Sequence, residues 1–137
     1  MIFFAAALLG VVAGLRTFTA PAVLLLMRAA SWPAYVLGVL AIGEYAGDLH
    51  PSAPARTRAG PLIARIVSGA FCGWTVASMN RAPAIAGAVA GVTGSLVGAF
   101  GGLRLRTLAV ERIGRVPAAI LEDVVAIVVA VAVVAAA

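Results

Sequence analysis

The chain has 137 residues, of which 64% are hydrophobic and 11% are charged, and its mean hydropathy is +1.12. Because so little polar surface cannot cover a soluble globular protein of this size, the composition predicts an integral membrane protein with a single domain, residues 1–137. The net charge is +5 and all ten basic residues are arginine, but no basic run is interleaved with stacking aromatic residues, which argues against a nucleic-acid-binding surface.

The first apolar segment runs from about Ile2 to Met27 and contains Arg16 near its middle. An ionisable side chain at the centre of a membrane helix costs about 2.5 to 3.5 kcal/mol, so Arg16 is a candidate for a functional site. Gly14 precedes it and Pro21 follows it. Because proline lacks the N–H group that an unbroken helix needs, we expect this first helix to be kinked or broken.

Four further apolar segments follow, at about Trp32–Leu49, Pro61–Met79, Pro83–Leu105 and Pro117–Ala136. Segments of about 20 apolar residues are long enough to cross a bilayer. The sequence therefore predicts an all-α, polytopic membrane helix bundle of about five segments. The links after the second and fourth segments carry most of the arginines, and short arginine-rich links stay in the cytoplasm. Five crossings then place the N-terminus inside and the C-terminus outside.

The sequence pattern around Arg16 recurs in the fourth segment, where Leu96–Thr107 matches Leu8–Thr19. Both copies read Gly, three residues, Gly-Leu-Arg, two residues, Thr, and Arg104 takes the place of Arg16. An odd number of crossings separates the two copies, so they should run in opposite directions, as in the inverted repeats of small transporters. The predicted division is repeat 1 at about 1–50, a linking helix at about 60–80 and repeat 2 at about 83–137.

Glycines in the fourth segment recur every three or four residues, which places them on one helical face: Gly87, Gly91, Gly94, Gly98 and Gly102. Such a face allows a neighbouring helix to approach closely. Helix packing is one reading of this face, and the lining of a narrow pathway is the other. Because five short helices enclose little space, we also expect a homodimer or a larger homo-oligomer, with this face close to an interface or to a closely packed neighbour.

Carboxylates gather where two apolar segments end and begin. Glu44 and Asp48 close the second segment, while Glu122 and Asp123 lie near the start of the fifth. Adjacent carboxylates repel near an apolar phase, and a proton or a bound cation relieves the repulsion. Arginines and threonine hydroxyls at similar depth would hold an anionic group. The predicted substrate-binding or ion-binding residues are Arg16, Thr17, Thr19, Glu44, Asp48, Arg56, Arg65, Arg104, Glu122 and Asp123. Charges that only pair with one another are the structural alternative.

Several short motifs are shared with a known family: GLRTFTAPAVL at 14–24, GEYAGDLHP at 43–51, PARTRAGPLIARIVSGAFCG at 54–73 and LED at 121–123. On these motifs, nearly the whole chain resembles a bacterial membrane-protein family catalogued as domain of unknown function 4126. The resemblance implies a small multi-pass protein of the bacterial cytoplasmic (inner) membrane. It implies no particular activity.

The buried charges and the repeat favour a small transporter or channel-like protein for an anionic or amphiphilic solute, coupled to a proton or another cation. Two alternatives stay open, namely binding or translocation of a lipid or polyprenyl-phosphate headgroup, and a noncatalytic membrane scaffold. No enzyme is expected, because the chain offers no nucleophile with a base and no nucleotide-binding loop. His50 and Cys72 are each single, so neither a metal nor a cofactor is expected. The expected partners are membrane lipids, the solute and further copies of the chain, without nucleic acid.

Overall fold

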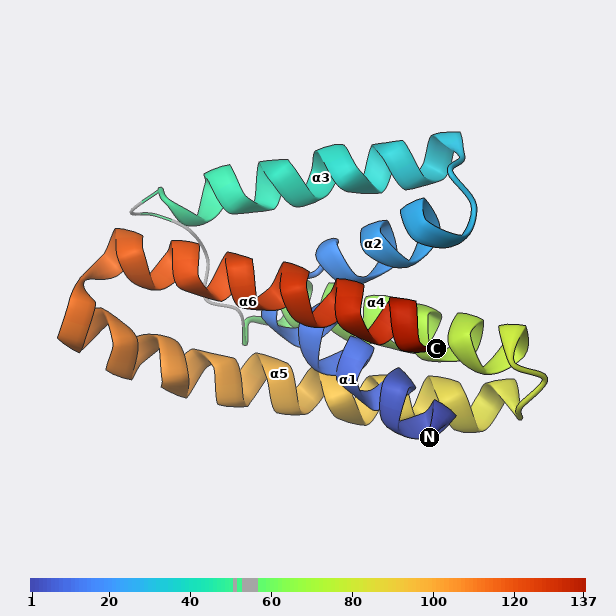
Figure 1. Ribbon diagram of the computed structural model, residues 1–137. Coiled ribbons are helices and arrows are strands. Elements are labelled where there is room, and N and C mark those ends of the chain that lie inside the picture. The colour runs from blue at the N-terminus through green and yellow to red at the C-terminus, as the bar shows by residue number, and fades with distance from the viewer. Residues whose placement is uncertain (51, 53–56) are drawn as a thin grey trace.

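The computed structural model describes residues 1–50, 52 and 57–137, and helices are the only regular elements in that part of the chain. The helices are α1 (Ile2–Leu15), α2 (Thr19–Arg28), α3 (Trp32–Asp48), α4 (Ala59–Met79), α5 (Ala84–Ile113) and α6 (Arg115–Ala136). They form one elongated bundle (Figure 1). Among the described residues, α4, α5 and α6 are each long and apolar enough to cross a membrane. Within the described part of the chain the all-helical prediction is confirmed, with six helices in place of five segments.

The additional helix arises because the first apolar segment is broken. α1 ends at Leu15, and α2 begins at Thr19. Pro21 is the third residue of α2, within the first turn, where its missing N–H has no helical partner to lose. In a continuous helix the proline ring would instead clash with the carbonyl of Thr17, four residues earlier. From the break, α2 turns back toward the end of the bundle at which α1 began (Figure 1).

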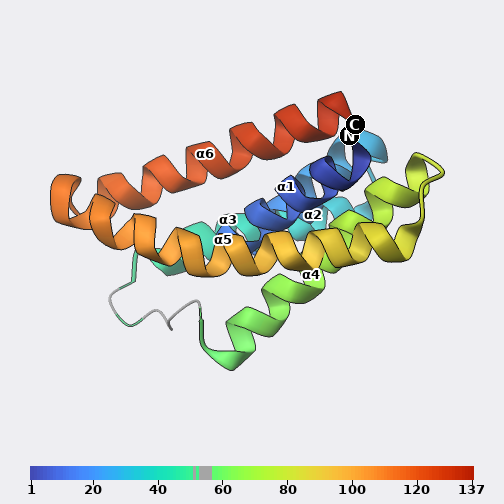
Figure 2. The same ribbon diagram turned by 90° about the horizontal axis from the view of Figure 1, so that it is seen from below.

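The two chain termini lie together at one end of the bundle. Met1 and Ala137 line the same surface hollow, and the N and C labels stand side by side in Figure 2. The expected placement of the N-terminus and the C-terminus on opposite sides of a membrane therefore does not hold in this structure. The physical reason is the break, since a first segment that turns back does not cross the bundle.

Glycines bring α1, α4 and α5 into direct backbone contact. A Cβ atom at Gly10 would overlap the carbonyl oxygen of Gly91, and one at Gly98 would overlap that of Val11. On the other side, a Cβ atom at Gly87 would overlap the carbonyl oxygen of Gly73. The predicted glycine face of α5 is thus a packing face. α4 contacts the N-terminal part of α5, and α1 contacts α5 farther toward its C-terminus. Its partners belong to the same chain.

The two copies of the repeated pattern run in the same direction. Gly94 meets Ala7, and Gly98 meets Val11, so residue numbers rise together along α5 and α1. Parallel helices are not related by the inversion that was expected for the repeat. α1 and α2 run out and back, so together they make no net crossing of the bundle. Two passes, α3 and α4, then come before α5, which therefore runs parallel to α1.

α3 lies at the edge of the bundle beside α2 (Figure 1). Only Ala34 and Ala41 are buried on this helix, and large apolar side chains such as Trp32 and Val39 are exposed.

α5 continues past its predicted end at Leu105 to Ile113, where Gly114 with a φ of 87° ends it. The arginine-rich part that was expected to be a link is therefore helical.

Candidate functional site

The break between α1 and α2 leaves backbone N–H groups without helical partners inside the bundle, and a carboxylate from α3 accepts hydrogen bonds from them. The amide of Thr17 donates to Oε1 of Glu44 at 2.9 Å, and the amide of Phe18 donates to Oε2 at 3.1 Å. Both amides lie at the N-terminus of α2, where the partial positive charge of the helix favours a carboxylate. Glu44 therefore occupies a small anion-binding nest formed by the broken backbone.

Side chains from α4 satisfy the carbonyl groups that the same break exposes. Arg65 donates from Nε to the carbonyl oxygen of Gly14 at 3.0 Å, and Ser68 donates from Oγ to that of Thr17 at 2.6 Å. The Thr17 carbonyl is the group that Pro21 cannot bond. Because an unpaired polar backbone group is costly where no water reaches, these contacts are what allow a broken helix in an apolar bundle.

Arg16 sits in the break itself and is completely buried. Its Nη1 lies 2.6 Å from Oδ2 of Asp48 on α3, and its Nη2 pairs with Oδ1 of Asp123 on α6. The guanidinium carbon is 5.3 Å from the centre of the Tyr45 ring, within the range of a cation–π contact. A buried guanidinium needs charge partners of this kind, and two separate helices supply them to Arg16.

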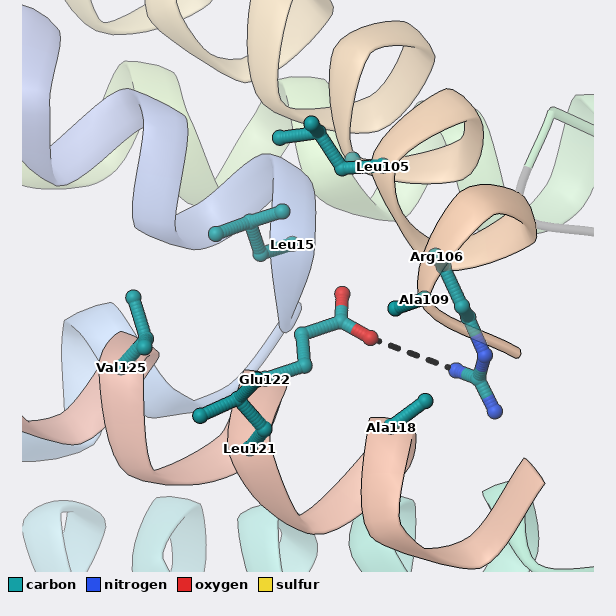
Figure 3. A pocket seen from close by; sticks show the side chains of 9 residues that line it. Leu15, Leu105, Arg106, Ala109, Ala118, Leu121, Glu122 and Val125 are labelled. Carbon is teal, nitrogen blue, oxygen red and sulfur yellow. Dashed lines mark hydrogen bonds and ion pairs between the residues drawn. The ribbon is translucent and has the colours of Figure 1, made fainter. Parts of the chain in front are cut away.

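Asp48 connects Arg16 to a second arginine. Oδ2 of Asp48 also accepts a bond from Nη1 of Arg106 on α5 at 2.6 Å. The same Nη1 lies 3.4 Å from Oε2 of Glu122, and Figure 3 shows these two side chains facing each other between α5 and α6. A single carboxylate of α3 thus links the helix break to α5 and α6.

We use the term charge cluster for seven side chains around the break: Arg16, Glu44, Asp48, Arg65, Arg106, Glu122 and Asp123. Ion pairs join five of them, from Asp123 through Arg16, Asp48 and Arg106 to Glu122, and Glu44 pairs with Arg65. Among the described residues the cluster contains four carboxylates and three guanidiniums. The C-terminus of α1 and the N-terminus of α2 meet beside it, so their opposite partial charges offset each other.

Most of the predicted site residues belong to this cluster or contact it. Six of them are members, namely Arg16, Glu44, Asp48, Arg65, Glu122 and Asp123. Thr17 takes part through its backbone, and the hydroxyl of Thr19 bonds that of Tyr45 at 2.6 Å. Arg56 lies outside the described residues.

Arg104 is an exception, because it is exposed and the structure places Arg106 in the cluster instead. The repeat pattern pointed to Arg104, but helical geometry points to Arg106. Arg106 follows Gly102 by four residues and therefore continues the buried glycine face, whereas Arg104 lies about 200° around the helix from Gly102. Ser68 and Tyr45 were also missed, since a serine or tyrosine in an apolar segment carries no signal of its own.

Hollows reach the charge cluster from two sides. Between α3 and α4, a hollow of about 620 Å³ is lined by Glu44, Asp48 and Arg65, and an apolar hollow of about 460 Å³ adjoins it. The linings of the two hollows share Thr17, Phe18 and Ala64, and we call the two hollows together the α3–α4 groove. A smaller hollow of about 190 Å³ between α5 and α6 is lined by Arg106 and Glu122 (Figure 3).

Comparisons with family models, with curated proteins and with solved structures found no match.

Proposed function

We propose that the protein is a small membrane transporter for an amphiphilic solute, coupled to a proton or another cation, and that the charge cluster is its site. The observation that carries this proposal is Arg16. It is a fully buried guanidinium at a helix break, held between Asp48 and Asp123 of two different helices. Buried charge networks at broken helices are costly, and membrane proteins use them mainly to bind solutes and ions.

The ion pairs of the cluster argue against an anion as the bound solute. Arg16, Arg65 and Arg106 each already have a carboxylate within ion-pair distance. An anionic solute would have to displace one of these carboxylates, whereas a proton can add to a carboxylate without displacing any group. Of the anionic and the amphiphilic solutes that the sequence leaves open, this arrangement supports the amphiphilic class.

α3 is the element best placed to move during transport. It supplies Glu44 and Asp48, which together contact the break, α4 and α5. Yet its body is buried only at Ala34 and Ala41. Adding a proton to Asp48 would weaken its bonds to Arg16 and Arg106, because the charge of the shared carboxylate holds both guanidiniums. We therefore infer that protonation releases α3 and opens the cluster to the α3–α4 groove.

We further propose that the bundle lies in the bacterial inner membrane, as the resemblance to the domain of unknown function 4126 implies, with its arginine-rich end in the cytoplasm. The arginines at that end are Arg58, Arg104, Arg106, Arg112 and Arg115, and those at the other end are Arg28 and Arg81. Because cytoplasmic loops carry the excess of arginine, both termini would then face the noncytoplasmic side. A homodimer or larger oligomer remains part of the proposal, since exposed apolar side chains cover much of α3.

The test is proton movement in proteoliposomes loaded with a pH-sensitive dye. Impermeant quaternary ammonium, phosphate and carboxylate amphiphiles are added in turn, and liposomes without protein give the background. The wild type should change the internal pH with at least one class. Arg16→Gln and Arg106→Gln should lose this signal. Arg104→Gln is the matched control, because Arg104 is exposed and stands two residues from Arg106.

Two results would contradict transport. One is a wild-type protein that moves protons with none of the three classes, and the other is Arg16→Gln with wild-type rates. Unchanged rates in all three variants would instead favour the scaffold alternative, in which the charges only hold the helices together. Binding of an amphiphile without proton movement would favour headgroup binding.

A further inference from the structure

The C-terminal part of α5 extends beyond the length that a bilayer requires. α5 has 30 residues, and at a rise of about 1.5 Å per residue about 20 of them cross a hydrocarbon core that is about 30 Å thick. The chain carries no charged residue between Arg81 and Arg104, which marks the limits of this crossing. The helix from Arg104 to Ile113 and the turn at Gly114 therefore lie at the level of the lipid headgroups. Figures 1 and 2 show this turn at one extreme end of the bundle.

The turn between α5 and α6 exposes apolar side chains at this level. Leu108 is 56%, Ile113 is 48% and Val116 is 52% exposed. Exposed apolar side chains are unfavourable in water, but at the edge of a membrane they insert among the upper parts of the acyl chains. We use the term α5–α6 corner for these three residues together with Arg112 and Arg115.

Both arginines of the corner are exposed. Gly114 stands between them, and its φ of 87° ends α5. Nη2 of Arg115 donates to the carbonyl oxygen of His50 at 2.8 Å, a neutral acceptor that does not offset the charge. Among the described residues, the ion pairs of the structure include neither Arg112 nor Arg115. Both guanidinium charges are therefore available to a partner outside the chain.

The exposed charge at this end of the bundle is positive. Four arginines are exposed there, namely Arg58, Arg104, Arg112 and Arg115. Among the described residues, Glu111 is the only aspartate or glutamate that is exposed. This surplus does not involve the charge cluster, whose side chains are buried or half-buried. A negatively charged surface therefore complements this end of the bundle.

We infer that the α5–α6 corner binds anionic phospholipid, with Arg112 and Arg115 on phosphate oxygens and the three apolar side chains among the upper acyl chains. A guanidinium suits a phosphodiester because its planar group donates two parallel hydrogen bonds. Apolar insertion and attraction to anionic headgroups add together at a membrane surface. The inference goes beyond the proposed function, since it requires that the bundle spans a membrane but not that it moves a solute.

Tryptophan fluorescence measures lipid binding at the corner itself. The reporter is the full chain with Trp32→Phe, Trp74→Phe and Ile113→Trp, which places its one tryptophan in the corner. Tryptophan favours the membrane interface, so the corner keeps its apolar character. The reporter is reconstituted in phosphatidylcholine bilayers that contain increasing fractions of either phosphatidylglycerol or phosphatidylcholine with brominated acyl chains. Bromine quenches a tryptophan that it contacts, and the two brominated lipids share the phosphodiester and differ in net charge.

We expect phosphatidylglycerol to reach half-maximal quenching at a fraction at least about fivefold lower than phosphatidylcholine, since one arginine near an anionic surface contributes about that factor. Arg112→Gln should reduce this preference about fivefold and leave quenching by phosphatidylcholine unchanged. Glu111→Gln should increase the preference, because it removes the exposed carboxylate beside Arg112. Arg81→Gln is the matched control, since it removes an exposed arginine at the opposite end of the bundle.

Equal quenching by the two lipids would overturn the inference, and so would an equal loss of preference in Arg81→Gln and Arg112→Gln. Quenching by neither lipid would also overturn it, because the corner would then stand clear of the membrane. The corner shares no side chain with the charge cluster. A failure of lipid binding here therefore leaves the transport proposal standing, and a failed transport test leaves this inference standing.

Discussion

At the scale of single residues, Pro21 explains why the break needs the Ser68 hydroxyl as a hydrogen-bond donor. Proline leaves the carbonyl of Thr17 without a helical partner, and the Ser68 hydroxyl bonds it at 2.6 Å. Both residues are buried, as Ser68 is 8% and Thr17 is 6% exposed. Water therefore does not readily replace the hydroxyl, and the Thr17 carbonyl depends on this one side-chain hydrogen bond.

We expect Ser68→Ala to destabilise the protein by about 1 to 3 kcal/mol, because it leaves a buried carbonyl unpaired. Ser95→Ala is the matched control. Ser95 is fully buried, but its hydroxyl bonds the carbonyl of Val92 within its own helix, which the helix already satisfies. Thermal unfolding in one detergent measures both variants. Equal unfolding temperatures for Ser68→Ala and Ser95→Ala would contradict this account of the break.

The sequence predicted the centre of the site better than its edges. Arg16 stands out because a charge inside a long apolar run is rare, and Glu44 and Asp48 stand out at a segment end for the same reason. On α5 the predicted site residue was Arg104, to which the short repeat points, whereas the cluster member is Arg106, to which the helical face points. The roles of Ser68 and of the Thr17 and Phe18 amides depend on where the backbone breaks, and side-chain types do not encode that position.

At the scale of helices, prolines made most segment boundaries predictable. Pro33 and Pro83 stand at the starts of α3 and α5 because proline is tolerated only before or within the first helical turn. The end of α5 was harder to predict. Hydropathy falls after Leu105, but arginine and leucine are good helix formers, and no strong helix breaker occurs before Gly114. The helix continues where the apolar pattern stops.

The glycines of α5 give a prediction at this scale. Gly91→Ala should destabilise the bundle by about 1 to 3 kcal/mol, because the new Cβ would overlap the carbonyl oxygen of Gly69. Gly101→Ala should instead stabilise α5 by up to about 1 kcal/mol, since alanine is the better helix former and nothing lies within 4 Å of the added Cβ. Unfolding of both variants in the same detergent should give shifts of opposite sign. A stabilised Gly91→Ala would refute the close contact of α4 with α5.

At the scale of the whole molecule, one local break changes the topology of every later helix. With a continuous first helix, α1 and α5 would run in opposite directions. With the break, α2 returns to the starting end, the two helices become parallel, and the termini meet. Sequence reasoning foresaw a kink or break near Pro21 but still counted the segment as one crossing, because periodicity does not record the direction in which a chain leaves a break.

This topology is testable by cysteine labelling in intact cells. In a Cys72→Ala background, a cysteine added before Met1 and the variants Ala137→Cys and Arg81→Cys should all react with an impermeant maleimide, because they lie at the end of the bundle that has few arginines. Arg112→Cys at the opposite end should react only after permeabilisation, and it is the internal control. Equal labelling of all four positions in intact cells would show that the cells leak. Labelling of the two termini from opposite sides of the membrane would mean that the first segment crosses, and the turned-back pair of α1 and α2 would be wrong.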